Sequence, residues 1–271
     1  MLRLRVLTAA VLVPLMVWAT FHLSTPALAL LFGVFFVAAA WEWTVLCGLH
    51  ATSVRVLYVT VLLAAGAILY RAPALPVMIA GVAWWIWEFS ELILYSDLRK
   101  GFLATVPGRQ LSGFFMLVPA WIAPLAVHAR RDGGPGLTLF IMVLVWTADS
   151  GAYFIGRPWG KTKIAPQVSP GKSLEGLLGG LVMVALVALV CGKYIWKFGT
   201  LALMLWLAIA VIAMLFSVLG DLAESRAKRI VGVKDSGHLL PGHGGVLDRI
   251  DAFTAAAPAF VLGWLLLRPL L

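Results

Sequence analysis

A segment near the C-terminus carries polar residues whose spacing could support phosphate chemistry. Four of them fall at i, i+3, i+4 and i+7: Asp221, Glu224, Ser225 and Lys228. In a helix these positions share one face, so carboxylates, a hydroxyl and an ammonium group would stand together. Carboxylates with a few waters and substrate phosphates are the usual ligands of Mg²⁺, and cations neutralise phosphate. This face therefore predicts the binding of a divalent cation and of phosphate groups.

A glycine-rich stretch and two more acids complete this segment. Gly244 and Gly245 follow His243, and glycines beside a histidine let backbone N–H groups approach phosphate oxygens. Asp248 and Asp251 then lie three residues apart in the first turn of a predicted helix, where acids are favourable. Capping would explain one such acid, but carboxylates on both sides of the stretch and near the membrane plane favour a functional role.

Basic residues accompany these acids, namely Lys228, Arg229, Lys234 and Arg249. They could neutralise substrate phosphates or anchor lipid headgroups. Composition alone leaves both interpretations open.

A second polar stretch runs from Asp149 to Glu175 and contains the triplets Gly160-Lys161-Thr162 and Gly171-Lys172-Ser173. Neither fits a P-loop, because only three residues separate Gly156 from the first triplet and Pro166 stands where the second needs its first glycine. No strand is predicted before either triplet. A basic loop remains that enters a helix at Ser173 and Glu175, and this is either a phosphate site or positive-inside charge with ordinary capping.

The elements that position these residues are membrane helices. The 271 residues are 62% hydrophobic and 12% charged, with a mean hydropathy of +0.98, which excludes a soluble globular domain. Each of nine apolar segments approaches the roughly 20 residues of a spanning helix: Val6–Phe21, Ala27–Leu46, Val54–Tyr70, Leu75–Leu94, Leu111–Val127, Leu137–Ile155, Leu174–Tyr194, Thr200–Leu219 and Ala252–Leu267. The predicted fold is all-α, a polytopic integral membrane protein with about nine transmembrane helices.

The positive charges predict how the chain crosses the membrane. With the N-terminus inside, 15 of the 21 Lys and Arg residues lie on the cytoplasmic side and 6 lie outside. The polar loops then face the cytoplasm, which in a bacterium implies the inner membrane. We expect residues 1–136 to form scaffold helices and residues 137–271 to form the catalytic region with its cytoplasmic loops.

Other features carry no assigned role. Glu42, Glu88 and Glu91 lie in apolar segments among tryptophans that are typical of an interfacial belt. The net charge of +9 is explained by cytoplasmic loops and anionic lipid, so no nucleic-acid partner is expected. The sequence leaves the oligomeric state open, a homodimer included.

Two blocks resemble a known family. The pattern Ser225-x-x-Lys228-Arg229, Lys234-Asp235-x-Gly237, Pro241-x-His243-Gly244-Gly245-x-x-Asp248-Arg249-x-Asp251 is similar to the signature of the phosphatidate cytidylyltransferases, or CDP-diglyceride synthases. One departure is Ala227, a packing position where the family usually has a bulkier apolar residue. The block from Asp149 to Gly176 is similar to a second block of the same family, which belongs to the nucleotide and metal region. The resemblance assigns a role to Asp149 less specifically than to the other positions, because an intramembrane acid can simply pair with a neighbouring span.

The resemblance implies the reaction of CTP with phosphatidic acid at the lipid bilayer to give CDP-diacylglycerol and pyrophosphate. The implied catalytic residues are Asp221, Lys228, Arg229, Asp248 and Asp251. Asp221 and Asp248 would hold Mg²⁺, as one or two divalent cations, with a monovalent ion left open. The nucleotide would be bound by Lys172, Ser173, Lys234, His243, Gly244 and Gly245. The lipid phosphate would be bound by Ser225, Arg229 and Arg249, although the division of basic residues between the two substrates is open.

Two other classes of function remain as alternatives. A CTP-dependent lipid kinase would release CDP, whereas a cytidylyltransferase, including one that acts on a polyprenyl-type phosphate, releases pyrophosphate. A transporter or channel lined by the intramembrane acids would show flux without nucleotide turnover.

Overall fold

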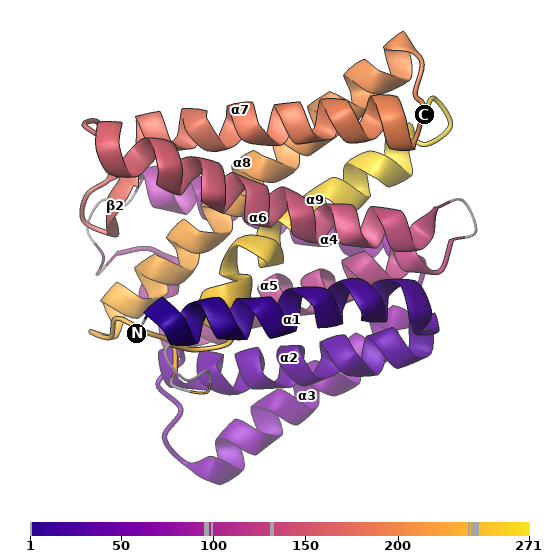
Figure 1. Cartoon of the computed structure of the whole chain (residues 1–271). Coiled ribbons are helices and arrows are strands. Elements are labelled where there is room, and N and C mark those ends of the chain that lie inside the picture. The colour runs from indigo at the N-terminus through magenta and orange to yellow at the C-terminus, as the bar shows by residue number, and fades with distance from the viewer. Residues whose placement is uncertain (1, 95–97, 99, 131–132, 238, 240–243) are drawn as a thin grey trace.

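The computed structural model describes residues 2–94, 98, 100–130, 133–237, 239 and 244–271, with side chains from residue 10 onward. The described chain is almost entirely helical (Figure 1). Its long helices are α1 (Leu2–His22), α2 (Thr25–Leu46), α3 (Thr52–Tyr70), α4 (Ala74–Leu94), α5 (Val106–His128), α6 (Gly134–Trp159), α7 (Leu174–Val190), α8 (Thr200–Ile230) and α9 (Leu247–Leu267). A 3-10 turn, η1 (Phe102–Ala104), precedes α5, and a π-helical turn, η2 (Cys191–Ile195), continues α7. The predicted all-α class is confirmed. Eight of the nine predicted apolar segments each lie within one of these helices, and the segment Leu174–Tyr194 covers α7 and most of η2.

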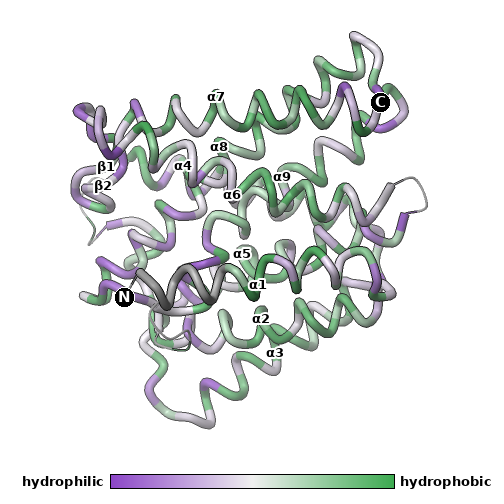
Figure 2. The backbone as a smooth tube through the Cα atoms, in the orientation of Figure 1, coloured by the Kyte–Doolittle hydropathy of each residue, from purple (hydrophilic) through white to green (hydrophobic). Residues whose placement is uncertain are grey.

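Most of the helices are suited to a bilayer. Among the described residues, the eight from α2 to α9 are long and apolar enough to cross a membrane, and α1 contributes a shorter apolar part, Ala10–His22. Hydrophilic residues gather at the two ends of the bundle, and apolar residues dominate between them (Figure 2). The chain is therefore a multi-pass membrane protein.

One end of the bundle collects the polar segments. The start of α1, the connection from α6 to α7 and the connection from α8 to α9 lie at the same end, and the C-terminus lies at the other (Figure 1). The connection from α6 to α7 forms an antiparallel hairpin of β1 (Lys163–Ala165) and β2 (Ser169–Ser173). The expectation that no strand precedes the Gly171-Lys172-Ser173 triplet is wrong, since β1 precedes it and the triplet itself lies in β2. The exclusion of a P-loop rests on spacing and stands.

Glycines allow α6 and α7 to approach each other closely. A Cβ on Gly151 of α6 would lie 2.8 Å from the carbonyl oxygen of Gly179 on α7, and a Cβ on Gly180 would lie 2.8 Å from the carbonyl oxygen of Ala148. Small residues at such crossings are the common means by which membrane helices pack, because lipid offers no hydrophobic drive for association.

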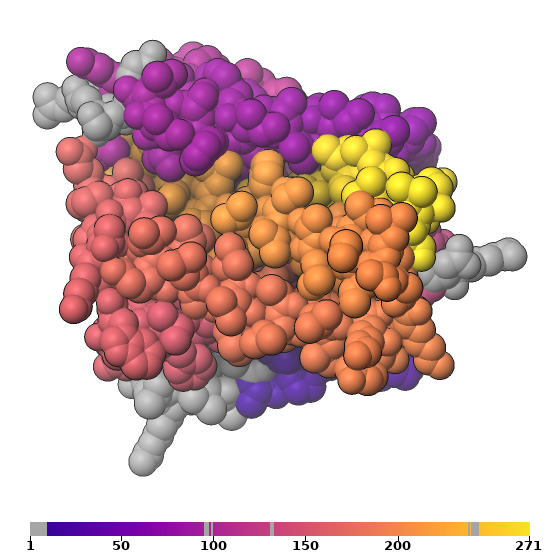
Figure 3. All heavy atoms as spheres, turned by 90° about the horizontal axis from the view of Figure 1, so that it is seen from above, coloured from indigo at the N-terminus to yellow at the C-terminus, as the bar shows by residue number. Residues whose placement is uncertain are grey.

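Helix α9 lies inside the bundle and contacts both halves of the chain. It packs most extensively on α8 and also contacts α5, α4, α6 and α2. Its middle is a run of fully buried alanines, Ala255–Ala257, and the indole of Trp85 on α4 donates to the carbonyl oxygen of Thr254, 3.2 Å away. On the face seen in Figure 3, the orange residues of α8 lie next to purple residues of the N-terminal half. The division into scaffold and catalytic region stays a prediction, because helices of both regions contact α9.

Candidate active site

The predicted polar face of α8 exists and reaches α9 through Lys228. The Lys228 Nζ lies 2.7 Å from Glu224 Oε2 on its own helix and 2.6 Å from Asp248 Oδ1 on α9. All three side chains are at least nine-tenths buried. In such surroundings a charge is tolerated only when it is paired and hydrogen-bonded. Lys228 therefore links the two helices at the polar end of the bundle.

Asp248 also holds the connection that precedes α9. Its Oδ2 accepts the backbone N–H of Gly245 at 2.9 Å and that of Ser236 at 3.1 Å. Gly244 has φ +83°, a conformation that L side chains rarely adopt, and this turn directs the next N–H toward Asp248. The N–H of Gly245 is thus used within the protein. His243 lies outside the described residues, as do residues 238 and 240–242.

Asp221 forms a second, more accessible ion pair. Lys172, at the end of the β-hairpin, lies with its Nζ 2.7 Å from Asp221 Oδ2, and the side chains are about a fifth and a third exposed. Lys172 also donates to the carbonyl oxygen of Val218 at 3.3 Å. The hydroxyl of Ser225 donates to Asp221 Oδ1 at 3.2 Å, as the i, i+4 spacing predicts. This pair joins the connection from α6 to α7 to the same end of α8.

A close helix crossing brings more acids to this place. A Cβ on Gly220 would lie 2.4 Å from the carbonyl oxygen of Asp251, so the backbones of α8 and α9 touch next to Asp221. The charge of Asp221 acts on Asp251 and on Asp149 of α6, and Lys172 acts on both in the opposite sense. Three helices therefore contribute carboxylates to one electrostatic cluster.

The donor set fits a divalent cation that substrate helps to hold. In the part of the chain that the structure describes, no group of three or more His, Cys, Asp and Glu side chains is arranged to bind a metal alone. Mg²⁺ needs no such cage, because it commonly uses one or two carboxylates together with waters and substrate phosphates. Asp221 and Asp248 offer such oxygens, and each is now paired with a lysine ammonium group.

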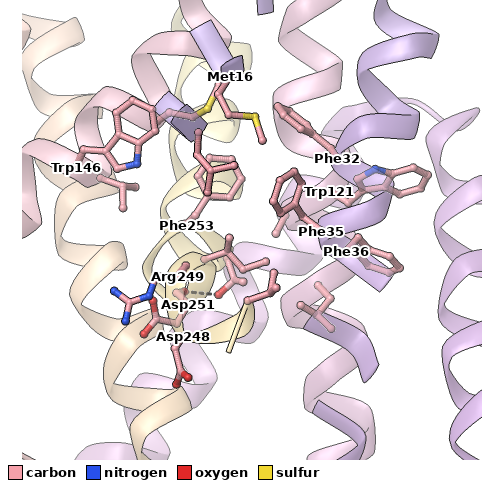
Figure 4. A pocket seen from close by; sticks show the side chains of 18 of the residues that line it. Met16, Phe32, Phe35, Phe36, Trp121, Trp146, Asp248, Arg249, Asp251 and Phe253 are labelled. Carbon is pink, nitrogen blue, oxygen red and sulfur yellow. Dashed lines mark hydrogen bonds between the residues drawn. The ribbon is translucent and has the colours of Figure 1, made fainter. Parts of the chain in front are cut away.

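An apolar cavity of about 370 Å³ opens beside Asp248 and Asp251. Its walls come from α1, α2, α5, α6 and α9 and include Met16, Phe32, Trp121, Trp146 and Phe253 (Figure 4). Its lining also contains a charged group made of Asp149, Asp248, Arg249 and Asp251. Arg249 acts electrostatically on Asp149. The cavity thus combines apolar walls with a charged end, which suits an amphiphilic ligand.

The start of α7 uses its polar residues for local structure. Ser173 is the N-cap, and its buried hydroxyl oxygen accepts the Gly176 N–H at 3.2 Å. Glu175 accepts the backbone N–H groups of Lys161 and Thr162, each at 3.1 Å, which holds the turn after α6. Both residues therefore shape the basic hairpin whose final strand carries Lys172.

The remaining predicted cations lie at the surface of the same end. Arg229, Lys234 and Arg249 are exposed. Within the described part of the chain, Arg229 donates two long hydrogen bonds of 3.4 Å, to the carbonyl oxygens of Val168 and Val233. These exposed side chains can contact an anion that arrives from solvent. For Arg229 this contact would replace the two long hydrogen bonds.

Sequence reasoning missed Glu42, to which it assigned no role. This residue of α2 is 3% exposed and accepts hydrogen bonds from the hydroxyl of Ser236 and from the N–H groups of Val246 and Leu247. A carboxylate inside an apolar segment was the available signal, because such acids are costly unless partnered or functional. Its partners lie about 200 positions away in the chain, and local spacing does not identify them.

Comparison with known proteins places this site in a family context. A family model described as "Cytidylyltransferase family" matches residues 3–266. The chain is 41% identical over 262 residues to a phosphatidate cytidylyltransferase of Pseudomonas aeruginosa, covering 96% of each chain. It is 37% identical over 281 residues to one of Haemophilus influenzae, covering 96% of this chain and 97% of that one. A phosphatidate cytidylyltransferase of Staphylococcus saprophyticus is 46% identical over 132 residues, about half of each chain.

Proposed function

This chain belongs to the cytidylyltransferase family, and on that premise we propose that it converts CTP and phosphatidate into CDP-diacylglycerol and pyrophosphate in phospholipid synthesis. An oxygen of the lipid phosphate attacks the α-phosphorus of CTP. A new P–O bond forms, and the bond to the β-phosphate oxygen breaks with pyrophosphate as the leaving group. The supporting observation is the position of the Lys228–Asp248 cluster beside a cavity with apolar walls and a charged end.

The residues contribute by positioning and by neutralising charge. The lipid phosphate is already anionic, so the reaction needs no strong general base, and bringing two polyanions together is the main barrier. Lys172 and Lys228 are each held by carboxylates. We propose that Lys172 and Lys234 serve the triphosphate, while Lys228, Arg229 and Arg249 serve the lipid phosphate and the transferring group.

Mg²⁺ is the cation that we propose for Asp221 and Asp248, with Asp251 as the neighbouring carboxylate. When bound, it would neutralise phosphate charge and stabilise the pyrophosphate leaving group. Lys172 and Lys228, the lysine partners of these acids, would serve phosphate oxygens. An ammonium group that moves from a carboxylate to a phosphate exchanges one charge-assisted hydrogen bond for another.

The cavity is the place that we propose for the lipid. Aromatic side chains and Met16 would contact apolar lipid surface, and Arg249 with its neighbouring acids forms the charged end, where the lipid phosphate would meet the nucleotide. We further propose that this polar end faces the cytoplasm from the inner membrane of a bacterium, because the positive-inside bias puts 15 of the 21 cations there.

The direct test is a reaction with purified protein, CTP labelled at the α-phosphate, phosphatidate and Mg²⁺. We expect labelled CDP-diacylglycerol and one pyrophosphate for each lipid product. Release of CDP with phosphate transfer to lipid would replace this proposal by a lipid kinase. A product from polyprenyl phosphate but none from phosphatidate would change the substrate. Ion flux in proteoliposomes without any nucleotide turnover would overturn the enzyme assignment.

A further inference from the structure

Glu42 is buried at the polar end of the bundle and receives three hydrogen bonds. Its Oε1 accepts the N–H of Val246 at 3.1 Å. Its Oε2 accepts the N–H of Leu247 at 2.8 Å and the hydroxyl of Ser236 at 3.1 Å. The first N–H groups of an α-helix have no partner inside the helix. A carboxylate from α2 therefore caps the first turn of α9, where the helix dipole also favours negative charge.

These donors come from both ends of one connection. Ser236 lies shortly after α8, and Val246 and Leu247 lie at the start of α9. Ser236 is held from two directions, because its hydroxyl donates to Glu42 while its N–H donates to Asp248. Glu42 thus fixes Ser236 against the start of α9 and sets the position of Asp248 in the first turn of that helix.

Two glycines of the signature are explained by this contact. A Cβ on Gly237 would lie 2.3 Å from Glu42 Oε1. A Cβ on Gly245 would lie 2.5 Å from Glu42 Oε2 and 2.1 Å from the hydroxyl oxygen of Ser236. Real Cβ atoms are not found at such distances, so these positions leave no room for a side chain while the carboxylate is in place. The glycines and Glu42 form one packed unit.

We propose that Glu42 is a positioning residue for the proposed cytidylyl transfer: it holds residues 236–237 and 244–247 so that Asp248 and the Gly244–Gly245 turn face the nucleotide. The inference rests on the proposed function for its kinetic consequences and on the hydrogen bonds for its structural part. Glu42 touches no reacting atom in this role. It acts through the segment that it clamps.

The number of acceptors at Glu42 makes the inference testable. Both carboxylate oxygens face backbone N–H groups, which can only donate. A glutamine has one acceptor oxygen, so its NH₂ group would meet either Val246 or Leu247 donor to donor. A buried donor left unsatisfied carries its full desolvation cost. Glu42→Gln should therefore weaken the hydrogen bonding of Glu42 to Val246 and Leu247 while preserving side-chain size.

Glu91→Gln is the matched control. Glu91 is also a buried acid of the N-terminal half, and one of its oxygens, Oε2, accepts the N–H of Phe102 at 2.7 Å. Among the described residues this is the hydrogen bond that Glu91 accepts, and a glutamine oxygen can replace that acceptor. The same chemical change should thus be tolerated at Glu91.

The first readout is steady-state kinetics with each substrate varied in turn. We expect Glu42→Gln to lower kcat/KM for CTP at least about tenfold, or about 1.4 kcal/mol, while KM for phosphatidate stays within about twofold of the wild type. Glu42→Asp keeps both oxygens on a shorter stem and should recover part of the loss. Ser236→Ala removes one of the three hydrogen bonds to Glu42 and should lower kcat/KM for CTP by a smaller factor, about threefold. Because this variant keeps the other two bonds, it tests the inference if Glu42→Gln fails to fold.

The second readout is hydrogen exchange of the peptide that contains Val246 and Leu247, which requires no turnover. Exchange should become at least about tenfold faster in Glu42→Gln and remain unchanged in Glu91→Gln. Unchanged exchange together with unchanged kcat/KM for CTP would overturn the inference. Equal losses in the two glutamine variants, or equal rises in both KM values, would also overturn it, because they indicate general destabilisation. An inactive wild type with slow exchange at these amides would refute the proposed function but not the structural role of Glu42 at the start of α9.

Discussion

Replacing Lys228 by methionine tests the buried ion-pair cluster most directly. Lys228 contacts Glu224 and Asp248, whose side chains are 0% and 8% exposed. Asp248 keeps two backbone donors in the variant. Glu224 loses the bond to its Oε2, and its Oε1 has no hydrogen-bond partner among the described residues. Most of the cost should therefore come from Glu224.

The expected magnitude follows from this burial. Removing one member of a buried ion pair typically costs about 3–5 kcal/mol, because it leaves a charge uncompensated, whereas an exposed pair is worth about 0–1 kcal/mol. We expect Lys228→Met to lose about 3–5 kcal/mol of unfolding free energy and all measurable turnover. Lys228→Arg, which keeps the charge but has a different shape, should recover only part of the activity.

The assay is unfolding of the purified protein in mixed micelles with increasing denaturing detergent, followed by helix content. The double variant Glu224→Met, Lys228→Met separates charge from packing, since apolar residues of similar size often replace a buried pair without loss. It should regain at least about 1 kcal/mol relative to Lys228→Met, within the coupling expected for contacting residues. A Lys228→Met variant within about 0.5 kcal/mol of the wild type, or a double variant that shows no recovery, would refute the reasoning.

The other predictions concern the metal, the accessible ion pair and the helix packing. Asp248→Asn should abolish turnover while the protein still inserts in the membrane, because one amide oxygen cannot serve the lysine and both backbone donors; near-normal activity would remove this residue from the site. Excess chelator should stop the formation of labelled lipid and added Mg²⁺ should restore it, and persistent turnover would exclude the metal. Lys172→Met breaks a partly exposed pair with Asp221, so unfolding should change by less than about 1 kcal/mol while the CTP requirement rises; a large stability loss or an unchanged CTP curve would contradict this. Gly179→Ala, whose Cβ would lie 2.5 Å from the neighbouring helix, should cost about 1–3 kcal/mol of stability, whereas Gly171→Ala, with nothing within 4 Å, should be neutral.

Local features of the site could be predicted because they depend on spacing within one helix. The i, i+4 relations of α8 appear as real bonds, from Ser225 to Asp221 and from Lys228 to Glu224. Helix α8 stops at Ile230, and Gly232 has φ +76°, which is the usual role of a glycine just after a helix end. The positions of the spans followed from apolar segments of sufficient length.

Partners from different helices could not be predicted in the same way. The pairing of Lys228 with Asp248 and of Lys172 with Asp221 depends on how α7, α8 and α9 pack. That packing is set by small contacts such as Gly220 against the backbone of Asp251, which single-sequence periodicity does not contain. The β-hairpin was missed because its strands of three and five residues show no clear alternation.

The N-terminal half contributes more to the site than a scaffold role implies. Its acid Glu42 caps α9 from α2, and its aromatic residues Phe32 and Trp121 form walls of the cavity whose charged end holds Asp248. Val246 and Leu247 are buried at the polar end of the bundle, so each of their backbone N–H groups needs a partner from the protein. A carboxylate with two acceptor oxygens, placed on a rigid helix, satisfies two such groups and a hydroxyl at once. The residues that carry the chemistry lie in the C-terminal half, whereas their geometry depends on a helix from the N-terminal half, about 200 positions earlier in the chain.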